Sequence, residues 1–365
     1  MAVSNFIIAL SISFVVGLAF TPPVIWLAKK LSVIDQPVGG RHIHKKPTPL
    51  LGGLAIFLGF NAVAFAYAFF TDNLTGDTII FKNLLGIFFG CLFLVIGGFL
   101  DDKYRLKPWQ AMIFPVLASV SVIMCGVGIS WITNLAGDGL WRLDLWSLRL
   151  FWYHGFPYNI TLPADIFTFI WLLGMIYTTK LLDGLDGLVS GVTVIGAAFI
   201  FFVALNKGEI VQYDVALLAT ILAGVFFGFL VFNFNPASIF LGEGGSTLAG
   251  FLLGSISIIS GSKVGITMLL LSIPILDVAW TVARRLFGRQ ALSLADKKHL
   301  HFRLLDAGFD MKRAVLLLYS VAVIFGLLAY FMQDQSGSLL ILGLLALIVF
   351  VALLLLISRR QKARA

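Results

Sequence analysis

The feature of this sequence that most constrains its fold is a series of long apolar runs separated by short polar segments. A helix needs about 20 apolar residues to cross a hydrocarbon layer about 30 Å thick. We count eleven such runs, and ten is the alternative count because several are short or interrupted by glycine. They cover residues 5–28, 50–70, 83–100, 109–129, 166–182, 188–205, 213–234, 247–261, 264–283, 314–332 and 338–358. The sequence therefore predicts an all-α polytopic membrane protein, with residues 1–365 in a single membrane domain.

The composition agrees with a chain that lies in lipid. Hydrophobic residues make up 59% and charged residues 12% of the 365 residues, whereas soluble domains are about 45–50% apolar and about 25% charged. This balance excludes an ordinary water-soluble core, and the lipid bilayer is the first partner that the sequence implies.

The basic residues fall mainly on one side of the predicted membrane. Counted in alternating loops, only five of the 26 Lys and Arg residues lie on the poorer side, namely Lys82, Arg142, Arg149, Lys207 and Lys263. Cytoplasmic loops are enriched in Lys and Arg, so we expect a multi-pass plasma-membrane protein with its N-terminus outside and its C-terminus in the cytoplasm. The net charge of +8 then records topology and does not indicate a nucleic-acid partner. The longest external segment, near residues 130–165, predicts a small hairpin or an interfacial loop.

Acidic residues gather at the cytoplasmic ends of the predicted spans. They lie at four places along the chain: Asp101-Asp102, Asp183 with Asp186, Glu243 and Asp277. A charge in the bilayer costs at least about 2.5–3.5 kcal/mol, so such residues are rare and usually functional. Each also has a structural alternative, as a helix end, a turn, a loop residue or a partner for backbone freed by a nearby proline. Together, the carboxylates favour Mg²⁺, which prefers oxygen ligands, with Mn²⁺ as the alternative.

Two local patterns add detail to this prediction. Asp183 and Asp186 are three residues apart, a spacing that would place them on one helical face where they could share a cation. The run Gly242-Glu243-Gly244-Gly245-Ser246 precedes an apolar segment. Its backbone N–H groups, with Ser246 as the helix N-cap, predict a phosphate-binding nest.

Basic loops with paired histidines flank the acids along the sequence. The first internal loop, residues 41–47, contains His44 and Lys46, and the last contains His299, His301 and Arg303. A His-x-His pair can bind zinc. Because Lys and Arg neighbours repel a cation and attract an anion, we favour phosphate contacts for both loops.

Five motifs in order give the chain a family resemblance over residues 35–310. They are His44-Lys45-Lys46-Pro47 with Gly52-Gly53, Gly98-Phe99-Leu100-Asp101-Asp102, Leu182-Asp183-Gly184-Leu185-Asp186-Gly187-Leu188, Asn235-Pro236-Ala237 with Phe240-Leu241-Gly242, and Asp296 with His299-Leu300-His301 and Arg303-Leu304-Leu305. At these residues the chain resembles the polyprenyl-phosphate N-acetylhexosamine-1-phosphate transferase family, glycosyltransferase family 4. The His-Leu-His-x-Arg-Leu-Leu form and Gly288-Arg289 resemble its undecaprenyl-phosphate GlcNAc-1-phosphate transferase branch.

The resemblance implies a reaction and a set of roles. A polyprenyl phosphate attacks the sugar-proximal phosphate of a UDP-sugar at the cytoplasmic membrane face and releases UMP, as the first membrane step of a cell-envelope glycan pathway. The carried-over catalytic residues are Asp101, Asp102, Asp183 and Asp186. The expected substrate and phosphate contacts are His44, Lys46, Lys180, Asn235, Gly242, His299, His301 and Arg303. The expected metal ligands are Asp101, Asp186 and Glu243.

Three positions depart from the family pattern. Lys180 stands where the family usually has Asn, Glu243 where it usually has Asp, and Phe302 where many relatives have His. Lys180 could hold a phosphate, pair with Glu243 or weaken metal binding. We hypothesise that the Lys180 and Glu243 changes compensate for each other.

Alternative functions remain open at this point. Within the family, the alternative is phospho-MurNAc-pentapeptide transfer. From another class, a secondary transporter also contains intramembrane acids and broken helices, but the sequence shows neither inverted repeats nor acids near the midplane. A catalytically impaired homologue is a third alternative because of Lys180 and Glu243. A homodimer is one assembly that the sequence leaves open.

Overall fold

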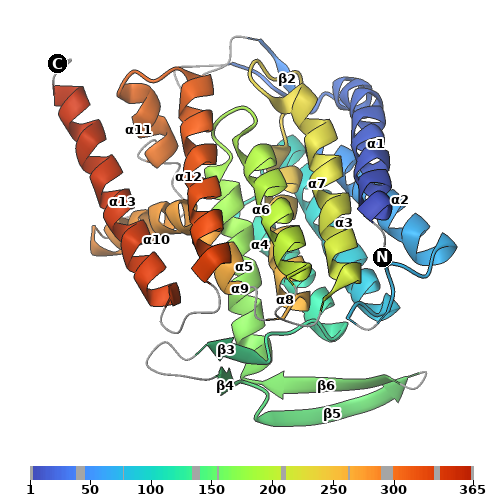
Figure 1. Ribbon diagram of the computed structural model, residues 1–365. Coiled ribbons are helices and arrows are strands. Elements are labelled where there is room, and N and C mark those ends of the chain that lie inside the picture. The colour runs from blue at the N-terminus through green and yellow to red at the C-terminus, as the bar shows by residue number, and fades with distance from the viewer. Residues whose placement is uncertain are drawn as a thin grey trace.

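The structure of this chain is a computed structural model. It describes residues 3–37, 46–76, 78–133, 140–153, 156–206, 211–261, 264–288, 299–332 and 338–362. These residues contain thirteen helices and six short strands. The helices run mostly side by side (Figure 1). They are α1 Val3–Lys30, α2 Gly52–Phe70, α3 Phe81–Tyr104, α4 Pro108–Met124, α5 Ala164–Leu182, α6 Leu188–Ala204, α7 Tyr213–Asn233, α8 Gly242–Ile259, α9 Val264–Leu270, α10 Ser272–Phe287, α11 Leu300–Asp306, α12 Met311–Met332 and α13 Ser338–Lys362.

The predicted all-α polytopic fold class is confirmed, although the expected count of eleven spans is not reached among the described residues. Among the described residues, seven helices are long and apolar enough to cross a membrane by length and composition, and α4 and α6 are shorter apolar helices. The expected span 264–283 is instead divided into α9 and α10. Pro274 lies in the first turn of α10 and has no N–H to donate to the preceding turn, so the α9 ladder cannot continue through it. Figure 1 shows α10 turned away from the direction of α9.

The centre of the bundle is built on α7 and α8. α7 packs against α1 and α6, and α8 packs against α3 and α5. Phe226, Phe229 and Phe251 from these two helices are fully buried. The α3–α8 contact depends on glycine, because a Cβ added to Gly98 would lie 2.1 Å from the backbone nitrogen of Gly244. This close approach brings the last turn of α3 against the first turn of α8.

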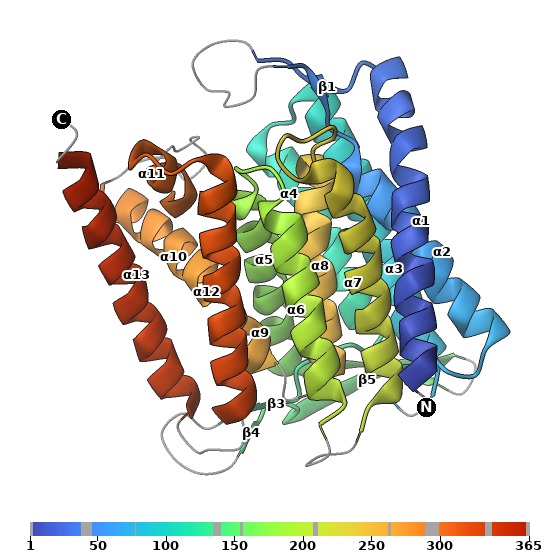
Figure 2. The ribbon, with the colours of Figure 1, turned by 45° about the horizontal axis from the view of Figure 1, so that its top comes forward.

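Short strands lie at the two ends of the bundle. At one end, β1 Ile34–Asp35 pairs with β2 Thr48–Pro49, and Phe240 N donates to Pro49 O at 2.8 Å, which ties this hairpin to the segment before α8. At the opposite end lie the antiparallel pairs β3 Trp131–Thr133 with β4 Leu140–Arg142 and β5 Trp146–Tyr153 with β6 Phe156–Leu162 (Figure 2). The hairpin predicted near residues 130–165 is therefore confirmed, as two consecutive hairpins.

Candidate functional site

Four of the predicted acids line one polar cavity at the β1–β2 end of the bundle. Its volume is about 380 Å³, within the range of small-molecule sites. The acids come from the end of α3, the loop after α5 and the start of α8. The polar lining residues are Asp35, Asp102, Lys180, Asp183, Asp186, Asn233, Glu243 and Ser246. The structure thus brings together four predicted acids that lie up to 141 residues apart, the separation between Asp102 and Glu243.

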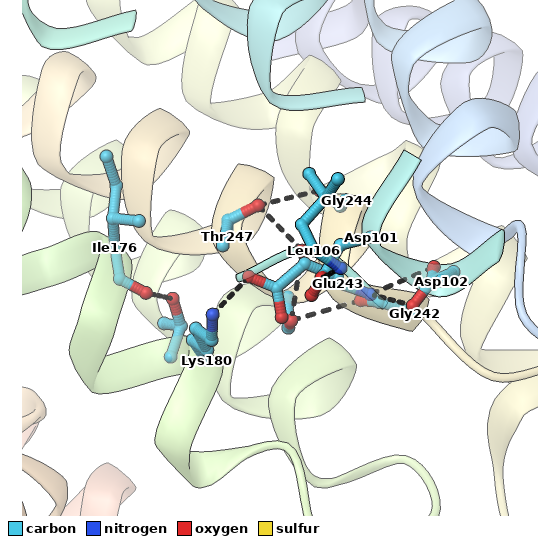
Figure 3. Close-up of polar contacts among 11 residues, drawn as sticks. Asp101, Asp102, Leu106, Ile176, Lys180, Gly242, Glu243, Gly244 and Thr247 are labelled. Atoms are coloured by element: carbon cyan, nitrogen blue, oxygen red, sulfur yellow. Dashed lines mark hydrogen bonds and ion pairs between the residues drawn. The ribbon is translucent and has the colours of Figure 1, made fainter. Parts of the chain in front are cut away.

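Asp102 binds the start of α8 through its carboxylate. The N–H of Glu243 lies 3.2 Å from both carboxylate oxygens of Asp102 (Figure 3). Gly242 makes this contact possible, because it has φ +69° and a Cβ there would lie 2.0 Å from Leu50 O and 2.5 Å from Asp102 Oδ2. A negative group is favourable at a helix N-terminus. The carboxylate of Asp102 therefore accepts from the Glu243 N–H, one of the backbone donors that the sequence predicts for a phosphate-binding nest.

The prediction that Ser246 is the N-cap of α8 is wrong. The helix begins four residues earlier, at Gly242, and its N-cap is Leu241, which makes no side-chain capping bond. The Ser246 hydroxyl instead donates to Gly242 O at 3.0 Å inside the first turn. The physical reason is that Asp102 supplies the capping acceptor from another helix, so the chain needs no local one.

Lys180 and Glu243 form an ion pair inside the cavity. Lys180 Nζ lies 2.5 Å from Glu243 Oε1, and their side chains are only 27% and 18% exposed. Figure 3 shows Glu243 between Lys180 on one side and Asp102 on the other. Of the three possibilities open for Lys180, the structure shows pairing with Glu243. The two departures from the family pattern thus contact each other.

The loop after α5 presents its two acids in different surroundings. Asp186 Oδ2 accepts hydrogen bonds from Asn235 Nδ2 at 2.8 Å and from Ala237 N at 3.1 Å. Asp183 lines the cavity beside it. Burial, followed by the negative charges of Glu243 and Asp186, raises the pKa of Asp183 to about 8. Burial is the largest cause of this shift, and the two neighbouring acids add to it; both effects disfavour the charged carboxylate.

Asp101 bonds the chain at the end of α3, the helix on which Asp102 also lies. Its Oδ1 accepts a hydrogen bond from Leu106 N at 2.8 Å. Between them, Arg105 takes a left-handed conformation with φ 53° and ends α3. The described lining of the polar cavity includes Asp102 but not Asp101. In this arrangement Asp101 stabilises the end of α3, and its predicted catalytic and metal-binding roles stay predictions.

The paired histidines pack behind the loop that carries Asp183 and Asp186. The rings of His299 and His301 are parallel, with centroids 5.7 Å apart. Nδ1 of His299 lies 2.9 Å from Asp277 Oδ2, and Leu300 N donates to Asp277 Oδ1 at 3.0 Å. Asp277 thus holds both His299 and the start of α11.

His301 is buried against the loop that carries Asp183 and Asp186. A Cβ added to Gly184 would lie 2.2 Å from His301 Nε2, and this nitrogen has no hydrogen-bond partner among the described groups. Burial and the neighbouring His299 lower the pKa of His301 to about 3. The ring is therefore neutral near pH 7, so that any phosphate contact would be a hydrogen bond and not an ion pair.

The other predicted contacts lie around the cavity or outside the description. Asn235 donates to Asp186 and is not among the described residues that line the cavity, whereas Gly242 lines it. Lys46 is exposed next to β2, and Arg303 is half-buried on α11. His44 falls outside the described residues.

From the sequence alone, no site role is predicted for the lining residues Asp35, Leu50, Asn233, Phe302 and Met311. Asn233 accepts from Ser190 Oγ at 2.7 Å and donates to Ile239 O at 2.9 Å. An amide at the end of an otherwise apolar run is a signal that could have singled it out. Phe302, noted only as a departure from the family pattern, has its side chain in the polar cavity.

The cavity contains the type of ligand atoms that a hard cation prefers, but these side chains are not arranged to coordinate one. Its carboxylate oxygens are donors of the kind that Mg²⁺ prefers, and they come from Asp102, Asp183, Asp186 and Glu243. Among the described residues, however, no group of three or more His, Cys, Asp or Glu side chains is arranged to hold a metal ion. Glu243 is engaged by Lys180 and Asp101 by Leu106.

Comparison with known proteins confirms the family resemblance. Residues 84–261 match the sequence profile of Glycosyl transferase family 4, a segment that runs from α3 through α8. A probable undecaprenyl-phosphate N-acetylglucosaminyl 1-phosphate transferase of Bacillus subtilis is 28% identical over 354 residues, which cover 95% of this chain and 90% of that protein.

Two further relatives bear on the donor. A decaprenyl-phosphate N-acetylglucosaminephosphotransferase of Mycobacterium leprae is 30% identical over 317 residues, covering 80% of this chain and 75% of that protein. A phospho-N-acetylmuramoyl-pentapeptide-transferase of Lactiplantibacillus plantarum is 27% identical over 308 residues, covering 80% and 87%.

Proposed function

This chain belongs to glycosyl transferase family 4, and from that membership and its acid-lined cavity we propose that it transfers N-acetylglucosamine-1-phosphate from UDP-N-acetylglucosamine to a polyprenyl phosphate. An oxygen of the lipid phosphate bonds to the sugar-proximal phosphorus of the donor. The bond from that phosphorus to the bridging oxygen breaks, and UMP leaves with this oxygen. The observation that carries the proposal is the convergence of Asp102, Asp183, Asp186 and Glu243 on one cavity at one end of a membrane bundle.

Asp102 is the residue that we propose handles the acceptor. A phosphate monoester keeps one proton with a pKa of about 6, and a carboxylate held in place can receive that proton as the oxygen attacks. The Glu243 N–H fixes the orientation of the Asp102 carboxylate. We favour direct displacement over a covalent enzyme intermediate.

The donor diphosphate needs positive charge in a cavity rich in acids. When bound, Mg²⁺ or Mn²⁺ would offset the diphosphate charge and improve UMP as a leaving group. Asp183, Asp186 and Glu243 are the lining residues that would hold it. Lys180 supplies one fixed positive charge to the same cavity.

We also propose that the cavity faces the cytoplasm across the plasma membrane. The basis is the Lys and Arg bias of the loops at that end and the cytosolic location of nucleotide sugars. A homodimer remains a prediction.

Release of UMP by the purified protein tests the function and the donor together. The assay offers UDP-N-acetylglucosamine, UDP-N-acetylgalactosamine and UDP-MurNAc-pentapeptide in turn, with undecaprenyl phosphate and Mg²⁺. We expect release with UDP-N-acetylglucosamine and its loss in Asp102→Asn. Preference for UDP-MurNAc-pentapeptide would favour the alternative within the family. No release with any donor, under conditions in which the protein stays folded, would contradict the proposal and favour an impaired homologue or a transporter.

A further inference from the structure

A tyrosine of α12 holds the loop that carries Asp183 and Asp186. The Tyr319 hydroxyl donates a hydrogen bond to the carbonyl oxygen of Gly187, the residue that directly follows Asp186. Gly187 is the N-cap of α6 and has φ +81°, so its carbonyl marks the point where the loop becomes helix. α12 packs beside α6 (Figure 2). Tyr319 lies outside residues 84–261, the segment that matches the family profile.

The space that the Tyr319 side chain occupies exists because residue 191 is glycine. A Cβ added to Gly191 would lie 2.0 Å from the Tyr319 hydroxyl oxygen and 2.1 Å from its ring atom Cζ. The Gly187 carbonyl also accepts from Gly191 N at 2.9 Å, as part of the backbone ladder of α6. A carbonyl oxygen has two lone pairs, so it can accept both hydrogen bonds. The tyrosine hydroxyl is thus a tertiary anchor on a carbonyl that the helix already uses.

A second contact from α12 reaches the other support of Asp186. Met311, at the start of α12, has its Sδ 2.9 Å from Asn235 Nδ2. The same amide nitrogen donates to Asp186 Oδ2 at 2.8 Å. α12 therefore contacts the surroundings of Asp186 twice, at the side chain through Asn235 and at the backbone through Gly187.

Apolar packing between the loop and α12 is incomplete. A cavity of about 20 Å³ lies behind the loop, and its lining includes Leu182 and Leu188, which bracket the loop, and Leu318 and Ala322 of α12. Groups that line a cavity lose the close contacts that would otherwise fix their position. The directional hydrogen bond of Tyr319 therefore restrains the loop at a place where packing restrains it less.

We propose that Tyr319 is a positioning residue whose hydrogen bond to Gly187 sets the place of the Asp186 carboxylate in the polar cavity. This inference rests on the proposed function, in which Asp186 lies on the donor side of the cavity. A shift of the loop would move Asp186 relative to the donor diphosphate and leave Asp102, on α3, in place. A misplacement of about 1 Å can slow a reaction up to about 100-fold, so loss of the hydroxyl slows the chemical step more than it weakens acceptor binding.

A matched pair of tyrosine substitutions tests this role. Tyr319→Phe removes the hydroxyl and keeps the ring, and Tyr330→Phe makes the same change near the other end of α12. We expect Tyr319→Phe to lower kcat for UMP release about tenfold, with the KM for undecaprenyl phosphate and the unfolding temperature near wild type. Tyr330→Phe should keep the wild-type kcat. Gly191→Ala, which displaces the Tyr319 hydroxyl from the other side, should also lower kcat, and combining it with Tyr319→Phe should add little further loss.

Hydrogen exchange gives a measurement that does not depend on turnover. Backbone amides of residues 184–191 should exchange faster in Tyr319→Phe than in the wild type or in Tyr330→Phe, and the other helices should exchange as before. Unchanged exchange in these residues, or faster exchange throughout the protein, would overturn the proposal. So would a wild-type kcat in fully folded Tyr319→Phe while the wild type releases UMP. If the wild type releases no UMP but exchange rises in residues 184–191 as expected, the proposed function fails and the anchoring of the loop by Tyr319 stands.

Discussion

The Lys180 ammonium and the Glu243 carboxylate are in contact, 2.5 Å apart, in a cavity that Asp102, Asp183 and Asp186 also line. Both side chains are mostly buried, so each partner lowers the cost of keeping the other ionised away from water. In this arrangement Lys180 supplies a protein cation where the acids would otherwise repel one another. A divalent cation that used Glu243 as a ligand would have to displace the Lys180 ammonium from the Glu243 carboxylate.

We predict that Lys180→Asn and Glu243→Asp are coupled. Lys180→Asn leaves Glu243 without its counter-charge, and Glu243→Asp shortens the side chain that contacts Lys180. The double change restores the pair of residue types usual in the family. The Mg²⁺ concentration for half-maximal activity should therefore change in each single variant and return toward wild type in the double variant. Coupling between contacting residues is typically about 0.5–3 kcal/mol. Effects of the two changes that simply add would show that the residues act independently. Thermal unfolding of the same four proteins separates a metal effect from a loss of fold.

Gly242 should tolerate no side chain. Gly242→Ala places a Cβ 2.0 Å from Leu50 O and 2.5 Å from Asp102 Oδ2, at a residue with φ +69°. Left-handed strain and overpacking each destabilise by about 1–3 kcal/mol, so we expect a lower unfolding temperature in detergent and loss of UMP release. Gly174→Ala is the control, because a Cβ on this α5 residue meets nothing within 4 Å. Equal unfolding temperatures for the two variants would contradict the close approach of Leu50, Gly242 and Asp102.

Hydropathy predicted the helices well because each span must be apolar along most of its length. It could not predict the division of residues 264–283, since Pro274 interrupts hydrogen bonding without interrupting the apolar run. The position of acids at the ends of spans predicted the cavity. Which of Asp101 and Asp102 accepts from Glu243 N was not predictable, because neighbouring helical residues point about 100° apart and the partner depends on how α3 packs against α8. The lining by Asp35, Asn233 and Phe302 likewise depends on how distant segments meet.

The stability of the metal-free protein should fall as pH rises. Burial and the charges of Glu243 and Asp186 raise the pKa of Asp183 to about 8, against about 3.9 in an unfolded chain. Between these values the folded protein binds more protons than the unfolded one, so the free energy of unfolding decreases with increasing pH. The unfolding temperature in EDTA should therefore drop from pH 5 to pH 8, and Asp183→Asn should flatten the slope. Asp310→Asn, at an exposed ion pair with Arg313, should keep the wild-type slope. A slope equally steep in Asp183→Asn would show that another group is responsible.

Asp277 should act through His299 as well as through the fold. One carboxylate oxygen accepts from Leu300 N at 3.0 Å and the other lies 2.9 Å from His299 Nδ1. Asp277→Asn keeps one acceptor oxygen and replaces the other by an NH2 group, so His299 must either change its tautomer to accept from that group or lose its partner. A buried donor left without a partner costs about 1–3 kcal/mol, so the unfolding temperature should fall. If Asp277 also positions His299, kcat for UMP release should fall about tenfold at a temperature where the variant is fully folded, with little change in KM for the donor. His299→Ala should then lower kcat similarly, and combining it with Asp277→Asn should add little further loss. A fully folded Asp277→Asn variant with wild-type kcat would restrict Asp277 to holding the start of α11.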